Sequence, residues 1–236
     1  MILPALLLAA AAAAAPSPER KVSFKTKDGW TIAALYRAPR KGGTVLLLAH
    51  GVAASKNEWA GFTSRLAEKG VGTLAIDLRG HGESKKGPAG TRDFTDFDAT
   101  GEWPNALADL EAAAVWLKSR DIREDRIALG GASIGANLAA AAAAARPKTP
   151  FLLLLSAGPN YRGVQLVRPR TRTLAVASPP DQTADLTLKP LAAVPGVETF
   201  EAPSGHGVQM FEDPVTLDRI VAWVVRSSPR AAGGTR

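Results

Sequence analysis

Apolar positions along the chain alternate between short continuous runs and longer stretches with helical spacing. Short runs bounded by turn residues are typical of strands buried in a sheet, whereas apolar residues three and four positions apart are typical of amphipathic helices. The sequence therefore predicts strands at residues 22–26, 30–37, 44–49, 72–78, 126–130, 151–156, 173–178 and 197–202. It predicts helices at residues 58–69, 103–120, 136–146, 183–193 and 214–226.

The order of these elements predicts the fold class. Strands and helices follow one another in turn, which favours an α/β fold with a mostly parallel sheet flanked by helices on both faces. Lys27-Asp28-Gly29 joins the first two strands and is a hairpin signal, so we expect an antiparallel hairpin at one edge. A chain of 236 residues has room for one such domain.

The two ends of the chain differ from the part between them. Residues 1–15 are apolar, rich in alanine and free of charged side chains. The run therefore lacks the Lys or Arg that a signal peptide carries near its start. The run is shorter than the roughly 20 residues of a membrane-spanning helix, which favours a signal peptide over stable membrane insertion. We expect export to the periplasm or medium, or a cytoplasmic location without a functional leader. The folded domain is then expected at residues 16–228, followed by a flexible tail at 229–236.

The composition narrows the possible chemistry. Cysteine is absent, which excludes disulfides, thiolate metal sites and cysteine nucleophiles. The net charge of +7 is compatible with an acidic partner, but Lys and Arg are scattered and aromatic residues do not interleave with them. We therefore expect a solvated basic surface and no nucleic-acid partner.

The sharpest chemical signal is Gly131-Ala132-Ser133-Ile134-Gly135, which lies between a predicted strand and a predicted helix. In a nucleophile elbow, such a turn lifts the serine hydroxyl above the sheet, and crowding between strand and helix requires small residues two positions away. An ordinary loop with a capping serine is the alternative. The flanking elements favour Ser133 as a nucleophile.

A serine nucleophile needs a neighbouring base. The chain has three histidines, and only His206 follows Ser133, as the order nucleophile, acid, histidine requires at such elbows. His206 lies in a glycine-flanked loop after a predicted strand. A solvent-exposed loop histidine without a catalytic role is the alternative.

The third member of the set would orient the imidazole. Asp181 follows the strand predicted at 173–178 and precedes His206, so it is our candidate. Asp185 is the second choice, because it falls inside the next predicted helix. Asp181 could instead act only as a helix N-cap.

An oxyanion intermediate needs preorganised N–H donors. We expect the backbone amides of Ile134, next to the nucleophile, and of Val52, in the loop after strand 44–49. His50 is expected to brace that loop. The segment at residues 77–84 contains Asp, His and Glu, but its spacing fits no common zinc site, so we expect a structural loop and no metal or organic cofactor.

Together these motifs resemble the α/β-hydrolase superfamily over residues 20–226, in the right order. The chain is similar to small bacterial esterases and dienelactone-hydrolase-like members, although dienelactone hydrolases proper use a cysteine nucleophile. The resemblance implies a triad of Ser133, Asp181 and His206, with Val52 and Ile134 as oxyanion donors. It also implies a small-molecule ester substrate.

Many relatives carry a cap domain, but residues 157–172 are too few for one. We therefore expect an open site, walled partly by residues 85–101, that suits small or short-acyl esters. A peptidase or thioesterase with the same triad remains an alternative, as does a non-catalytic binding protein that keeps the fold.

Overall fold

The computed structural model describes residues 15–229. The expected leader and tail therefore lie outside the described residues, apart from their last and first residue respectively.

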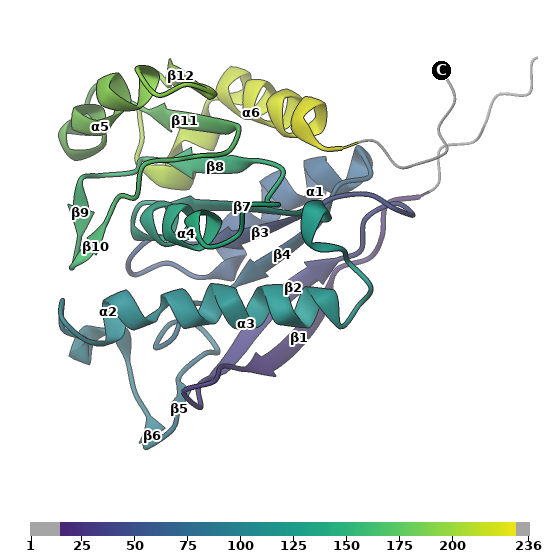
Figure 1. The fold of residues 1–236 in the computed structure, drawn as a ribbon, viewed down its shortest axis with the longest axis vertical. Coiled ribbons are helices and arrows are strands. Elements are labelled where there is room, and N and C mark those ends of the chain that lie inside the picture. The colour runs from purple at the N-terminus through teal and green to yellow at the C-terminus, as the bar shows by residue number, and fades with distance from the viewer. Residues whose placement is uncertain (1–14, 230–236) are drawn as a thin grey trace, which may run out of the picture.

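An eight-stranded sheet forms the centre of the molecule, with the strand order β1-β2-β4-β3-β7-β8-β11-β12 (Figure 1). Neighbouring strands are parallel except in the pairs β1–β2 and β2–β4, which are antiparallel. The predicted α/β class and the antiparallel N-terminal hairpin are confirmed. The strands are β1 Arg20–Lys25, β2 Thr31–Arg37, β3 Val45–Ala49, β4 Gly72–Ile76, β7 Ile127–Ala132, β8 Leu152–Leu155, β11 Thr173–Ala177 and β12 Val197–Glu201.

Helices cover both faces of this sheet (Figure 1). Apolar residues of α3, α4 and α5 pack on one face and those of α1 and α6 on the other, which buries β3, β4, β7, β8 and β11 completely. Burial on both faces explains why these strands are continuous apolar runs. The helices are α1 Ala60–Glu68, α2 Glu102–Asn105, α3 Leu107–Lys118, α4 Ile134–Ala144, α5 Gln182–Ala192 and α6 Pro214–Ser227.

Local structure differs from the prediction in four places. The helix predicted at 103–120 is divided at Ala106 into α2 and α3, where the Asp109 N–H bonds to the Ala106 carbonyl in a tighter turn. The helix predicted at 58–69 begins with a 3-10 turn, Lys56–Trp59, before α1. Two small hairpins were not predicted, because ladders of two residues are too short to show a period. They are β5 Lys86–Gly87 with β6 Gly90–Thr91, and β9 Asn160–Tyr161 with β10 Val164–Gln165.

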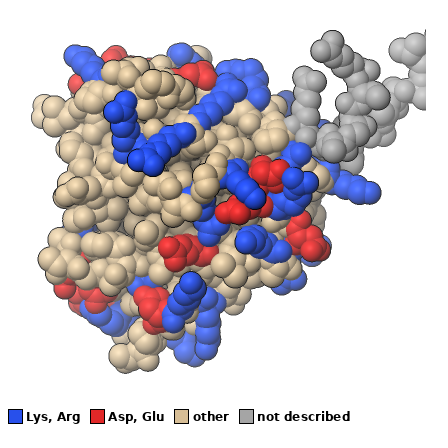
Figure 2. All heavy atoms as spheres, viewed as in Figure 1, with Lys and Arg blue, Asp and Glu red and all other residues tan. Residues whose placement is uncertain are grey.

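Two further properties concern the surface and the helices. Acidic side chains lie among the basic ones over much of the face in Figure 2. Within residues 15–229, none of the helices combines the length and the apolar character that crossing a bilayer requires.

The sheet topology determines where functional side chains can meet. In a parallel sheet the loops after the strands lie at one rim. The loops after β3, β7, β8, β11 and β12 carry Val52, Ser133, Tyr161, Asp181 and His206, respectively.

Candidate active site

Ser133 occupies a strained turn between β7 and α4. Its backbone angles are φ 55° and ψ −125°, a region that costs about 1–3 kcal/mol for a residue with a side chain. A Cβ on Gly131 would lie 2.2 Å from the Gly135 carbonyl oxygen, and one on Gly135 would lie 2.3 Å from the Ala49 oxygen. The motif therefore needs both glycines for steric reasons. The structure places Ser133 at the strand-to-helix junction that the sequence predicts.

Asp181 and His206 are in direct contact. The Asp181 Oδ2 atom lies 2.6 Å from His206 Nδ1, and the side chains are 10% and 42% exposed, respectively. Asp181 also caps α5, since its Oδ1 atom accepts a hydrogen bond of 3.3 Å from the Ala184 N–H. The Asp181 carboxylate thus contacts the imidazole and also caps the helix. Asp185 lies inside α5, as predicted.

Two buried serines hold the loop that carries His206. The Ser178 hydroxyl donates a hydrogen bond of 2.6 Å to the Gly205 carbonyl, and the Gly207 N–H donates one of 2.8 Å to Ser156 Oγ. Ser156 follows β8 and Ser178 follows β11, so both sides of the histidine are tied to the sheet. The sequence analysis missed these serines; their place at the ends of predicted strands was the only available signal.

The histidine loop packs against the elbow. A Cβ on Gly207 would lie 3.0 Å from the Cβ of Ala132, the residue before Ser133. Among the described residues there is no direct hydrogen bond between Ser133 and His206; Tyr161 contacts both. Its hydroxyl lies near the Ser133 side chain, and its ring lies edge-on to the imidazole with centroids 6.3 Å apart. Like the two serines, Tyr161 was missed by the sequence analysis.

The predicted oxyanion donors flank the nucleophile. A Cβ on Gly51 would lie 3.4 Å from the Ser133 Cβ, which brings the loop of Val52 beside Ser133. Ile134 is the first residue of α4. Neither the Val52 nor the Ile134 N–H has a protein acceptor within the described part of the chain. Two amides are thus available near the serine.

Glu58 lies behind the loop of Val52. Its Oε1 atom accepts a long hydrogen bond of 3.4 Å from the Gly51 N–H. Burial raises the pKa of Glu58 to about 7, and the bond to Gly51 only partly opposes this rise.

His50 and His81 are structural, as expected for His50. The His50 Nε2 atom accepts a hydrogen bond of 3.0 Å from the Leu78 N–H, and Nδ1 lies 2.7 Å from the Gly51 carbonyl oxygen. Burial, aided by His81, lowers the pKa of His50 to about 3. The described residues contain no group of three acidic, histidine or cysteine side chains that could hold a metal ion.

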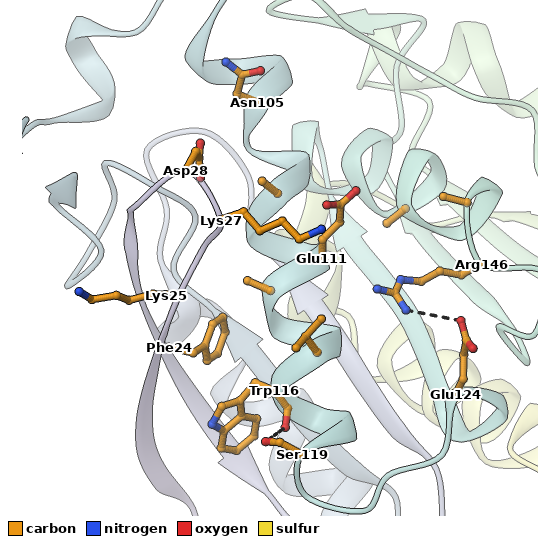
Figure 3. Close-up of a pocket in the computed structure, with 15 residues that line it drawn as sticks. Phe24, Lys25, Lys27, Asp28, Asn105, Glu111, Trp116, Ser119, Glu124 and Arg146 are labelled. Carbon is orange, nitrogen blue, oxygen red and sulfur yellow. Dashed lines mark hydrogen bonds and ion pairs between the residues drawn. The ribbon is translucent and has the colours of Figure 1, made fainter. Parts of the chain in front are cut away.

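A hollow of about 840 Å³ lies between the N-terminal hairpin, α3 and α4, away from the candidate catalytic residues (Figure 3). Phe24 and Trp116 form its aromatic wall, Lys27 points toward Glu111, and Arg146 pairs with Glu124 at 3.6 Å. None of the three candidate catalytic residues lines it. The candidate active site therefore lies outside this hollow.

The parallel sheet, the strained serine turn at its rim and the carboxylate-histidine pair beside it define an α/β hydrolase. Residues 40–184 match the model of one family within this fold, the serine aminopeptidases S33. The chain belongs to this family.

A relative by sequence is an uncharacterized protein of Mycobacterium tuberculosis, 28% identical over 147 residues. The match covers 59% of this chain and 48% of the relative, so the chain spans about half the length of the curated relatives it matches.

Solved structures show the same fold at low identity. A dienelactone hydrolase from Anabaena variabilis is 19% identical with a TM-score of 0.64, over 90% of this chain and 97% of its own. A thermophilic carboxylesterase cloned from a metagenomic library is also 19% identical, with a TM-score of 0.65 over 90% of each chain.

Proposed function

We propose that the protein hydrolyses small carboxylic esters by acyl transfer, with Ser133 as nucleophile, His206 as base and Asp181 as the residue that orients the imidazole. The 2.6 Å contact between Asp181 and His206, in a loop packed against the elbow of Ser133, carries the proposal. A loop histidine without a function has no need of a nearly buried carboxylate on Nδ1. The names of the two similar structures, an esterase and a dienelactone hydrolase, agree with this substrate class.

The proposed reaction begins with Ser133. Its oxygen attacks the ester carbonyl while His206 Nε2 accepts the hydroxyl proton, and the Asp181 carboxylate stabilises the resulting imidazolium. The amides of Val52 and Ile134 donate hydrogen bonds to the oxyanion. The tetrahedral intermediate then expels the alcohol, which takes the proton from His206. Water, activated by the same histidine, releases the acid from the acyl-enzyme.

The absence of a cap supports a preference for short acyl chains. Between β8 and β11 the chain forms only the small hairpin β9–β10. An open site buries little of a long chain, and each buried methylene contributes only about 0.8 kcal/mol. We expect kcat/KM for p-nitrophenyl esters to fall as the acyl chain lengthens from acetate to dodecanoate. Equal or rising values would contradict this preference.

The direct test of the function is the Ser133→Ala variant. We expect kcat/KM for p-nitrophenyl acetate to fall by about 10³-fold or more, because the oxyanion donors alone provide little turnover. Ser119→Ala is the matched control: within residues 15–229 its hydroxyl bonds only to the Trp116 carbonyl at the end of α3, and activity should persist. Full activity of Ser133→Ala would exclude this residue as the nucleophile.

The match to serine aminopeptidases favours peptide hydrolysis as a second candidate. An aminopeptidase acts on a substrate with a free α-amino group, whereas an esterase has no such requirement. Side-by-side assays with acetyl esters and aminoacyl p-nitroanilides distinguish the two. The ester proposal predicts a higher kcat/KM for the acetyl esters.

A further inference from the structure

Tyr161 lies on a hairpin that is fixed from two sides. The buried Asn137 side chain of α4 donates hydrogen bonds of 2.9 Å to the Gly158 and Val164 carbonyls, which flank β9 and β10. On the other side, a Cβ on Gly163 would lie 1.9 Å from the Ala99 carbonyl oxygen. The hairpin is thus packed between α4 and the segment at residues 85–101, and the position of Tyr161 is well determined.

The ring and hydroxyl of Tyr161 have separate contacts. The ring covers Gly158, where a Cβ would lie 2.6 Å from a ring carbon, and it stands edge-on to His206. The hydroxyl donates a hydrogen bond of 3.2 Å to the Ser156 carbonyl and lies near the Ser133 side chain. Tyr161 therefore places a hydroxyl donor beside the nucleophile elbow and the imidazole.

The strand order shows on which side of the nucleophile Tyr161 stands. Ser133 follows β7, whose neighbours in the sheet are β3 on one side and β8 on the other. Val52 follows β3, whereas Tyr161 follows β8, next to β11 and β12, which precede Asp181 and His206. Tyr161 thus lies on the side of the imidazole, opposite the loop of Val52. In acyl transfer the leaving group receives its proton from the imidazole.

We propose that Tyr161 is a further catalytic residue of the ester hydrolysis proposed above: its hydroxyl, on the imidazole side of Ser133, hydrogen-bonds the departing alcohol oxygen during acylation. In this step the bond from Ser133 Oγ to the carbonyl carbon forms and the bond from that carbon to the alcohol oxygen breaks. The proton from Ser133 passes through His206 to the alcohol. Tyr161 keeps its own proton and turns it from the Ser156 carbonyl to the leaving oxygen.

The electrostatic environment suits a permanent donor. Burial and the nearby Asp181 carboxylate raise the pKa of Tyr161 to about 12, and the neighbouring Ser133 hydroxyl offsets this only in part. The Tyr161 hydroxyl therefore stays protonated at neutral pH.

The inference predicts a dependence on the leaving group, which a purely structural tyrosine would not produce. A poor leaving group such as ethoxide needs the hydrogen bond more than nitrophenolate does. In Tyr161→Phe, kcat/KM for ethyl acetate should fall by about tenfold, the size of one lost hydrogen bond, and kcat/KM for p-nitrophenyl acetate by less. The two substrates share their acyl group. The ratio of their kcat/KM values therefore reports only on the leaving group.

Two variants complete the experiment. Tyr36→Phe is the matched control, because Tyr36 is the other tyrosine of the chain and packs on Trp116 in the N-terminal hairpin. Its substrate ratio should equal that of the wild type. Gly158→Ala should reproduce the altered ratio. Its Cβ would displace the Tyr161 ring and hydroxyl from their position, although the tyrosine itself is unchanged.

Equal losses on both esters, or no loss, in Tyr161→Phe and Gly158→Ala would overturn the role of Tyr161. The proposed function is tested separately by Ser133→Ala and by labelling of Ser133 with a fluorophosphonate. Labelling of Ser133 in a Tyr161→Phe protein with an unchanged substrate ratio would refute the inference and leave the hydrolase proposal standing.

Discussion

Two groups of loops at the same rim of the sheet carry the same types of side chain in different environments. The loops after β3 and β4 contain His50, Asp77 and His81, which are at most 1% exposed. The loops after β11 and β12 contain Asp181 and His206, and the imidazole of His206 is 42% exposed. His50 has a backbone partner at each ring nitrogen, whereas His206 has a carboxylate on Nδ1 and, among the described residues, no hydrogen-bond partner on Nε2.

The difference separates a structural histidine from the histidine that we propose as the catalytic base. Burial holds His50 in its neutral form, because a proton added to Nε2 would oppose the Leu78 N–H. A general base must exchange a proton with a substrate, which requires one accessible nitrogen and a charge partner for the protonated form. Only His206 among the histidines meets both conditions.

The largest effect should come from removing the exposed imidazole. In His206→Ala, kcat/KM for p-nitrophenyl acetate is expected to fall by about 10³-fold or more, since Ser133 loses its base. The melting temperature should change little, because the side chain is nearly half exposed. Retained activity with an unchanged fold would show that another group acts as the base.

Replacing a residue of the buried cluster around Asp77 should lower the free energy of unfolding instead of the activity. Asp77 accepts hydrogen bonds from the Lys56 N–H at 2.7 Å, from Lys56 Nζ at 2.6 Å and from the Glu83 N–H at 2.8 Å. Asp77→Asn leaves the buried Lys56 ammonium without its main counter-charge, which costs about 3–5 kcal/mol. Urea unfolding measures this cost.

The control for that variant is Asp125→Asn, which breaks the exposed pair with Arg123 and should cost less than about 1 kcal/mol. Similar losses in the two variants would contradict a structural role for the buried cluster.

The pH dependence of stability should identify His50. The unfolded chain binds a proton at His50 below about pH 6.5, whereas the folded protein, with a pKa of about 3, does not. His50 therefore lowers the stability of the wild type as the pH falls from 6.5 toward 3, by about 1.4 kcal/mol per pH unit. His50→Phe removes this dependence, although it costs about 1–3 kcal/mol for each backbone group left unpaired.

The measurement is the difference in unfolding free energy between the wild type and His50→Phe at pH 7.5 and 5. Burial raises the pKa of Glu58 to about 7 and that of Asp109 to about 6, so both bind protons in the folded state and act in the opposite direction. Taking the difference between the two proteins cancels these carboxyls. Parallel pH profiles would refute the assignment.

The smallest effect concerns the serine that holds the histidine loop. Ser178→Ala removes the bond to the Gly205 carbonyl, which is worth about 1 kcal/mol, so we expect kcat to fall by about fivefold. KM should change little, since the proposed substrate does not contact Ser178. A loss equal to that of the exposed Ser119→Ala control would show that this bond does not position His206.

The sequence was sufficient for residues whose role is visible locally. Gly131 and Gly135 mark the turn of Ser133 because strand and helix collide there with any larger residue. The pairing of Asp181 with His206 could be predicted from their order after predicted strands, and the structure brings the two side chains into contact. The roles of Ser156, Ser178 and Tyr161 could not be found in this way, because they depend on contacts between loops that are distant in the sequence. Tyr161, for example, lies near Ser133 on a hairpin whose two strands have only two residues each.

The central claim is that Ser133 is activated by His206 at the rim of the sheet. The most direct measurement is fluorophosphonate labelling followed by peptide mass spectrometry of the wild type, Ser133→Ala and His206→Ala. We predict one adduct per chain on Ser133, none in Ser133→Ala and much slower labelling in His206→Ala. An adduct on a different serine, or equal labelling rates with and without His206, would contradict the account.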